Sequence, residues 1–211
     1  IDSVEIARTM NDSLFRHKLG YNKETMACLF IPETYQVYWD MSVEDFFKRM
    51  RKEHQRFWNQ KRLDQAKAIG MTPEEVCTLA SIVEEETNNN PEKPMVAGLY
   101  INRLHAGMPL QADPTVKFAL QDFGLRRITN EHLTIDSPYN TYRNPGLPPG
   151  PIRIPSPVGL DAVLNHAKHN YIYMCAKEDF SGTHNFASNY ADHMKNARKY
   201  WNALNERKIF K

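Results

Sequence analysis

The acidic run Glu84-Glu85-Glu86 is the first candidate for chemistry in this sequence. It closes a predicted helix from Pro73 to about Thr87, and successive side chains of a helix are about 100° apart. The apolar positions of that helix fall on one face: Val76, Leu79, Ala80 and Val83. Glu85 then points into solvent, whereas Glu84 and Glu86 flank the apolar stripe.

Glu86 lies one turn beyond Val83, at the edge of the face expected to be buried. Burial disfavours the charged carboxylate and raises its pKa, and a carboxylic acid that keeps its proton near neutral pH can protonate a glycosidic oxygen. The competing interpretation is a solvated charge run at a helix end. Acids near a helix C-terminus are unfavourable with the helix macrodipole, which slightly disfavours a purely solvated charge run. The pattern leaves both interpretations open.

Two further segments carry polar groups suited to binding. In Leu110-Gln111-Ala112-Asp113-Pro114-Thr115 we expect Asp113 to be a helix N-cap and Gln111 to face a cleft. In Ser137-Pro138-Tyr139-Asn140-Thr141-Tyr142, the two tyrosines can stack on sugar rings, while Asn140 and Thr141 can bind hydroxyl and acetamido groups. A rigid turn with packed aromatic rings is the alternative for this second segment.

Several other classes of site are disfavoured. With 27 basic and 25 acidic residues, the net charge of +2 gives no electrostatic footprint for nucleic acid. The histidines offer no paired ligands with a third group on one predicted element, so we expect no metal: His166, His169, His184 and His193. Cys28, Cys77 and Cys175 are expected to be buried free thiols. No apolar run approaches the length of a membrane span.

Local signals predict the elements that hold these residues. The first seventy residues read as helical, with one helix from Ile1 to Leu19 and another that Ser42 caps and that continues to about Ala68, near Gly70. Between them, Leu29 to Trp39 is aromatic and β-branched, which predicts a strand or an extended docking segment.

The remainder begins at the clearest boundary in the chain, Thr72-Pro73-Glu74-Glu75, which combines a capping box with proline in the first turn. The further predicted elements are helices at Lys93 to Ala106 (ending at Gly107), from Asp113, at Pro157 to His166 and at Tyr190 to Arg207, strands at Tyr171 to Ala176 and Thr183 to Ala187, and a functional loop at Asp136 to Pro157. We expect an α+β fold, mostly helical with short hairpins around a substrate cleft, divided into residues 1–70 and a catalytic core at 71–211.

Taken together, five segments resemble the MltG (YceG-like) family of endolytic murein transglycosylases in order and spacing. They are Ala80 to Thr87, Val96 to Leu104, Gly107 to Val116, Tyr139 to Tyr142 and Gly146 to Ile152, and the late His184-Asn185-Phe186 resembles the family's His-x-Phe element. The likeness begins at about Leu29. It departs from the family at Leu29-Phe30-Ile31-Pro32-Glu33-Thr34-Tyr35, where Leu-Phe-Pro-Asp-Thr-Tyr is common, and at Glu85, where lysine is common.

The resemblance implies that Glu86, the last acid of the Ile-Val-Glu-x-Glu stretch, is the essential catalytic residue. It also points to a set of substrate-binding residues: Glu84, Asn102, Gln111, Asp113, Tyr139, Asn140, Thr141 and Tyr142. The expected partners are peptidoglycan glycan strands, with peptidoglycan synthases as candidate protein partners. No cofactor is expected, since no candidate lysine site for pyridoxal phosphate is visible, although similar sequences have been labelled aminodeoxychorismate lyases.

Family members carry an N-terminal membrane helix and a small LysM-like subdomain. Neither is recognisable in these 211 residues, so we expect the single-pass anchor in the cytoplasmic (inner) membrane to lie outside this sequence, with the catalytic part on the outer, periplasmic side.

The expected reaction breaks the β-1,4 bond between N-acetylmuramic acid and N-acetylglucosamine and leaves a 1,6-anhydro end. Glu86 would first protonate the leaving oxygen and then, as a carboxylate, take the proton from the attacking C6 hydroxyl. The rivals are a lysozyme-like hydrolase that uses Glu86 and Asp113 as its two carboxylates, and a non-catalytic peptidoglycan-binding scaffold.

Overall fold

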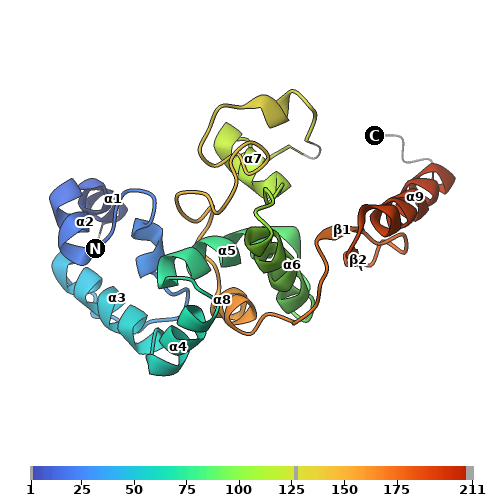
Figure 1. Cartoon of the computed structure of the whole chain (residues 1–211). Coiled ribbons are helices and arrows are strands. Elements are labelled where there is room, and N and C mark those ends of the chain that lie inside the picture. Colours follow the sequence, from blue (N-terminus) through green and yellow to red (C-terminus); the bar gives the residue numbers. More distant parts are fainter. Residues whose placement is uncertain (1, 126–127, 208–211) are drawn as a thin grey trace.

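The computed structural model describes residues 2–125 and 128–207, and in these residues the fold is mostly helical with one two-stranded sheet (Figure 1). The α-helices are α1 (Ser3–Asn11), α2 (Ser13–Leu19), α3 (Val43–Phe57), α4 (Gln60–Ala68), α5 (Pro73–Glu86), α6 (Lys93–His105), α7 (Asp113–Leu120), α8 (Pro157–Leu164) and α9 (Tyr190–Glu206). Short 3₁₀ helices form at η1 (Met26–Leu29) and η2 (His132–Thr134), and the strands are β1 (Tyr173–Ala176) and β2 (His184–Ala187). The predicted α+β class is confirmed.

The capping signals placed most helix ends correctly. The side chain of Thr72 accepts a hydrogen bond from the backbone N–H of Glu75 while the Glu75 carboxylate accepts one from Thr72 N–H, so the predicted capping box forms at α5. Ser42 caps α3 through Asp45 N–H. Gly107 follows α6 with a φ of +64°, a left-handed conformation in which glycine carries no steric penalty.

Two segments that were each predicted as one helix are divided into two helices in the structure. The segment from Ile1 to Leu19 breaks at Asp12, whose backbone is extended and whose side chain accepts hydrogen bonds from Leu14 and Phe15 N–H. The helix expected from Ser42 to Ala68 breaks at Trp58, after which Asn59 caps α4 through Arg62 N–H. In both places an Asx cap begins a new helix inside an otherwise helical pattern, and satisfying free N–H groups outweighs helix continuity.

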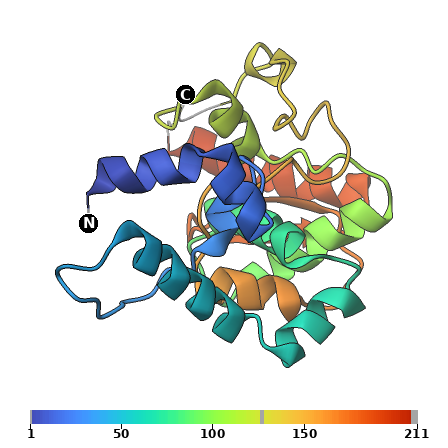
Figure 2. The ribbon, with the colours of Figure 1, turned by 90° about the vertical axis from the view of Figure 1, so that its left-hand side faces the viewer.

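No strand forms in residues 29–39, so the strand interpretation of this segment is wrong, and the extended docking segment stays a prediction. The chain here is irregular, and Tyr35 O–H donates back to the Ile31 carbonyl oxygen at 2.6 Å. Tyr38 and Trp39 are 83% and 99% exposed, on the loop that projects from the start of α3 in Figure 2. Aromatic composition alone predicted a strand, but no partner strand is available here to pair with it.

The core is built around α5, which is buried along almost its whole length between α6 and α8 (Figure 1). Two glycines allow these helices to approach closely. A Cβ on Gly98 of α6 would lie 2.4 Å from the Ala167 carbonyl oxygen, and one on Gly159 of α8 would lie 2.7 Å from a carboxylate oxygen of Glu84. The first glycine lets the chain that follows α8 lie against α6, and the second lets α8 lie against Glu84 in the last turn of α5.

A second, smaller cluster packs under the N-terminal helices, with Met26, Leu29, Val43, Phe47 and Met50 at its centre. The main core also draws on this part of the chain, because Trp58 and Ala66 belong to it. Residues 1–70 therefore do not bury their apolar side chains apart from the rest. The division at residue 70 stays a prediction.

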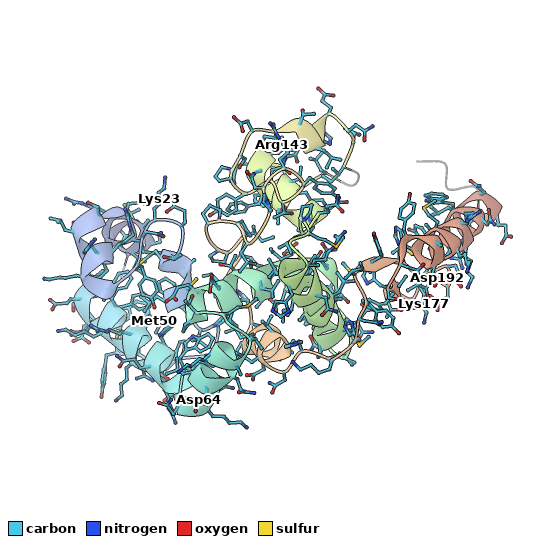
Figure 3. The ribbon with its side chains drawn as sticks, viewed as in Figure 1. Lys23, Met50, Asp64, Arg143, Lys177 and Asp192 are labelled. Carbon is cyan, nitrogen blue, oxygen red and sulfur yellow. The ribbon has the colours of Figure 1, made fainter. Side chains whose placement is uncertain are left out.

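β1 and β2 pair antiparallel, with Tyr173 opposite Ala187 and Ala176 opposite His184. The predicted hairpin and the C-terminal helix are confirmed, although both strands are shorter than expected. α9 packs against the hairpin, and the two together lie on the side of α6 away from α1–α3 (Figures 1 and 3). This arrangement gives the end of α5 a wall on its far side.

Candidate active site

Glu86 is the last residue of α5, and the fold holds its carboxyl group close to the next helix. Tyr100 of α6 donates its hydroxyl proton to Glu86 Oε1 at 2.6 Å. Tyr100 itself is 1% exposed, and its pKa lies well above the ordinary value, first because of burial and then because of the neighbouring carboxyl group. The phenol therefore stays protonated and keeps its donor directed at Glu86.

Burial raises the pKa of Glu86 to about 7. The hydrogen bond from Tyr100 opposes this rise, the negative charge of Asp113 adds to it, and positive charge on His184 and Lys117 weakly opposes it. Loss of hydration outweighs the stabilising bond because the side chain is only partly exposed. Glu86 can therefore hold a proton near neutral pH, as its place on the helix predicted.

The other two acids of the run have different surroundings. Glu85 points outward and pairs with Arg153 at 2.7 Å between exposed side chains, as predicted. Glu84 is buried and accepts hydrogen bonds from Lys93 Nζ at 3.2 Å and from the backbone N–H and hydroxyl of Ser156. Burial acts to raise the pKa of Glu84, but the Ser156 and Lys93 bonds outweigh it and lower the pKa. Glu84 thus ties α5 to the start of α8.

A cavity of about 400 Å³ opens beside Glu86. Its walls come from the end of α5, from α6, from the chain entering α7, from the loop before α8, and from the hairpin with α9. The lining residues are Glu86, Leu99, Tyr100, Arg103, Gln111, Asp113, Tyr142, Tyr173, Met174, Cys175, Ala176, His184, Tyr190 and His193. The cavity is thus an aromatic and polar cleft, and Glu84 is not part of its wall.

Asp113 does not cap α7, contrary to the prediction. It is the first residue of the helix, and the cap position is Ala112, whose N–H instead donates to Thr141 Oγ1 at 3.0 Å. The Asp113 carboxylate accepts a hydrogen bond from the Tyr142 hydroxyl, with 2.6 Å between the two oxygens, and lines the cavity. Thr141, from the nearby loop, accepts the hydrogen bond of a free backbone N–H at the start of the helix. The Asp113 carboxylate is therefore not needed as a cap and faces the cleft.

Gln111 lines the cavity, as expected, in a strained backbone conformation with a φ of +53°. Its N–H donates to the Thr141 carbonyl oxygen at 3.1 Å, and its side-chain oxygen accepts from Arg103 Nη2 at 2.8 Å. Arg103, which is 8% exposed, also donates through Nη1 to the Leu110 carbonyl oxygen. Bonds on both sides hold Gln111 against the strain.

The predicted sugar-binding loop divides into one residue that reaches the cavity and three that do not. Tyr142 lines it through the bond to Asp113. The ring of Tyr139 packs on Phe118, with ring centroids 4.7 Å apart. Asn140 and Thr141 are 0% and 1% exposed. For these three residues the structure favours the rigid turn over sugar contact.

The Asn140 side chain links separate parts of the long loop to one another. Its Nδ2 donates to the carbonyl oxygens of Leu133 and Ile135, both at 2.9 Å, and its Oδ1 accepts from Tyr142 N–H at 3.1 Å. Each such hydrogen bond is worth about 1 kcal/mol, and a partly buried carbonyl oxygen left without a donor costs more. The loop that carries Tyr142 to the cavity therefore depends on this side chain.

We expect Asn140→Ala to lower the free energy of unfolding by about 2–4 kcal/mol, because it leaves two carbonyl oxygens without their donor. Turnover per folded molecule should change much less. Chemical denaturation together with activity normalised to the folded fraction measures both. Asn144→Ala is the matched control: its Nδ2 donates to the carbonyl oxygens of Ser137 and Asn140, but the residue is exposed and water can replace these bonds. Equal stability of the two variants would contradict this role.

Asn102 also lies outside the cavity. Its Nδ2 donates to the carbonyl oxygens of His169 and Tyr171 at 2.8 and 3.0 Å. These bonds fix the segment that runs from α8 into β1. Asn102 therefore supports the hairpin wall, and its expected contact with substrate finds no support in this geometry.

Sequence reasoning missed several residues of the wall: Tyr100, Arg103, Tyr173, Tyr190 and His193. The first two are three positions apart in the Val96–Leu104 motif, and this spacing places them on one face of α6. His184 was visible as the His-x-Phe element but had no assigned role. The signal available in the sequence was the polar face of α6, the helix that follows Glu86 in the chain.

Within residues 2–125 and 128–207, no cluster of three or more histidine, cysteine or acidic side chains has the arrangement of a metal site. Cys28, Cys77 and Cys175 are free, as predicted; the first two are buried as expected, whereas Cys175 is only half-buried. None of the described helices has the length and apolar character needed to cross a membrane.

Fold and site together define a mostly helical α+β domain with a protonatable glutamic acid in an open aromatic cleft. The sequence model of the YceG-like family matches residues 2–199, and the chain belongs to that family. A crystal structure of a yceG-like protein from Listeria monocytogenes superimposes with a TM-score of 0.75 at 30% identity, covering 92% of this chain and 67% of that one.

Two similar curated proteins are named endolytic murein transglycosylase. The one from Bacillus subtilis is 35% identical over 168 residues, which span 80% of this chain and 46% of the relative. The one from Streptococcus pneumoniae is 33% identical over 141 residues, or 65% of this chain and 25% of the relative. The chain thus spans less than half the length of these relatives.

Proposed function

We propose that this chain carries the catalytic region of an endolytic murein lytic transglycosylase, with Glu86 as its acid. The observation that carries the proposal is the half-buried Glu86 carboxyl group, held by Tyr100 in an open cleft and able to keep its proton near neutral pH. The relatives named endolytic murein transglycosylase support the choice of substrate.

The cleft suits a strand of amino sugars. Tyr142, Tyr173 and Tyr190 supply aromatic faces on which sugar rings can stack, and Gln111 and Asp113 supply polar groups for hydroxyl and acetamido contacts. These are the substrate-binding residues that the geometry supports.

In the reaction, Glu86 donates its proton to the oxygen that leaves C1 of N-acetylmuramic acid. The C6 hydroxyl of the same sugar attacks C1, so the product ends in a 1,6-anhydro ring and no water is consumed. An internal nucleophile needs no second carboxylate to activate water. In the simplest form, the Glu86 carboxylate also takes the proton released by the C6 hydroxyl.

A lysozyme-like hydrolase is the second candidate, and one observation favours it. Asp113 faces the cavity, so the expectation that capping would occupy it no longer argues against a second catalytic carboxylate. Its hydroxyl partner Tyr142 is compatible with either reaction. A non-catalytic scaffold is disfavoured, because it needs neither a proton-holding acid nor a hydrogen bond from a buried phenol.

The two reactions separate when purified glycan strands are digested in heavy-oxygen water and the new ends are weighed. We expect an anhydro end, lighter by one water than a hydrolysed end, without incorporated label. Label at the new reducing end would show that water attacked C1, and the hydrolase would replace the transglycosylase. Asp113→Asn gives a second readout: a hydrolase should lose about 100-fold or more in kcat, whereas a transglycosylase should retain most of its turnover.

The same proposal places the catalytic region outside the cytoplasm, where murein lies. We further propose that the full-length protein is held at the cytoplasmic membrane by a single helix outside this sequence and acts beside peptidoglycan synthases. Fractionation of cells that express the full-length protein, followed by crosslinking, tests both parts.

A further inference from the structure

His184 lies in the wall of the same cavity as Glu86 but comes from the opposite end of the chain, at the start of β2. Glu92, just before α6, accepts two hydrogen bonds from it: the backbone N–H of His184 donates at 2.7 Å, and the ring Nδ1 lies 3.0 Å from the other carboxylate oxygen. Glu92 is 8% exposed. A buried carboxylate thus holds both the strand and the ring orientation of His184.

This pairing determines what the imidazole can do. A carboxylate only accepts hydrogen bonds, so Nδ1 must carry a proton. In the neutral ring, Nε2 then has a free lone pair. Within residues 2–125 and 128–207, no protein group forms a hydrogen bond with Nε2 of His184. The histidine is therefore prepared to accept a proton, in the manner of a base that a carboxylate orients.

Glu86 is prepared for the opposite task. It begins the reaction with its proton in place and becomes a carboxylate base only after that proton has passed to the leaving oxygen. Both side chains line the same cavity, and any positive charge on His184 would lower the pKa of Glu86, so the two groups can interact across it. Two groups on different elements can serve the leaving and attacking oxygens together.

We propose that His184 is the general base that takes the proton from the C6 hydroxyl, with Glu92 as the residue that positions it. The inference rests on the transglycosylase proposed above. The bond from C1 to the leaving oxygen breaks as that oxygen receives the Glu86 proton, and the C6 oxygen then forms a bond to C1 on the same face of the ring as its own proton passes to Nε2. Afterwards the imidazolium returns a proton to the Glu86 carboxylate through solvent in the open cavity.

The test compares His184→Asn and His184→Ala on purified glycan strands. The asparagine amide can still donate to Glu92 from the place of Nδ1 but has no counterpart of Nε2, so its fold should persist. We expect kcat to fall by about 100-fold or more in both variants, with KM changed less than about threefold. Added imidazole should raise the kcat of His184→Ala at least about tenfold, because the missing ring leaves a space that imidazole can fill.

Two controls accompany these variants. His105→Ala removes an exposed histidine at the end of α6 and should neither lose activity nor respond to imidazole. Glu86→Gln should stay inactive in imidazole, because its acid is missing. Glu92→Gln, which weakens the orientation of the ring, should lower kcat but less than His184→Asn.

Near-normal kcat in His184→Asn, or a loss in His184→Ala that imidazole does not relieve, overturns the assignment of the base. A loss that appears in KM alone also overturns it and makes His184 a binding residue. These failures leave the anhydro product of the wild type unchanged, whereas heavy-oxygen label in that product overturns the transglycosylase itself. The two proposals therefore fail in distinguishable ways.

Discussion

Glu86→Gln should abolish strand cleavage, lowering kcat by about 1,000-fold or more, while the protein stays folded. The amide keeps the size of the side chain and can still accept the hydrogen bond from Tyr100, but it has no proton to give to the leaving oxygen. Loss of general acid catalysis alone costs roughly 100- to 10,000-fold. Mass spectrometry of digested strands, with the melting temperature of each variant, measures the effect.

Glu85→Gln is the matched control, because it makes the same chemical change one residue earlier in α5. Its carboxylate is exposed and pairs only with the exposed Arg153, and such surface pairs contribute little to stability. Activity and melting temperature should stay close to those of the wild type. An equal loss of activity in both variants, or full activity in Glu86→Gln, would remove Glu86 from the mechanism.

The second large effect is a loss of activity at alkaline pH. Glu86 must be protonated when the substrate is bound, and burial raises its pKa to about 7. As the pH rises through about 7, the protonated fraction falls and kcat/KM should fall tenfold for each further unit. Initial rates from pH 5 to 9 on soluble glycan strands measure this limb. A profile that stays flat to pH 9 would contradict the protonated acid.

Stability should follow the same group with a defined sign. The pKa of Glu86 is raised from 4.5 to about 7 on folding, so between these values the folded protein binds the proton more tightly than the unfolded chain. This contribution is fully present below pH 4.5 and is lost as the pH rises through about 7, a change of roughly 3 kcal/mol. Glu86→Gln should lack this decline, so denaturation at pH 5 and pH 8 separates the two proteins.

Helix ends in this protein follow from residues that are neighbours in the chain. The capping box of Thr72 and Glu75, the cap at Ser42 and the left-handed Gly107 were all visible in the sequence. Each depends on hydrogen bonds or backbone angles within a few residues, where local chemistry decides. The phase of α5 then placed Glu86 at the edge of a buried face.

Some local patterns compete with one another, and no local signal indicates which of them prevails. Asp12 and Asn59 each begin a new helix inside a pattern that favours one long helix. Asp113 has the type and position of a cap, yet the Ala112 N–H bonds to Thr141, 29 residues away, and the carboxylate turns to Tyr142. Only the path of the long loop decides whether Asp113 caps α7 or lines the cleft.

The sequence by itself determined the family and the α+β class and predicted Glu86 as the acid, because these depend on motifs and helix phase. The tertiary structure alone decided which polar residues share the cavity with it. Tyr100 reaches Glu86 from the next helix, and Glu92 holds His184 across 92 residues. In the long loop, Tyr142 faces the cleft while its neighbour Asn140 is buried. Side chains adjacent in the chain diverge here because burial and hydrogen bonding depend on the packing of distant segments, which no local pattern records.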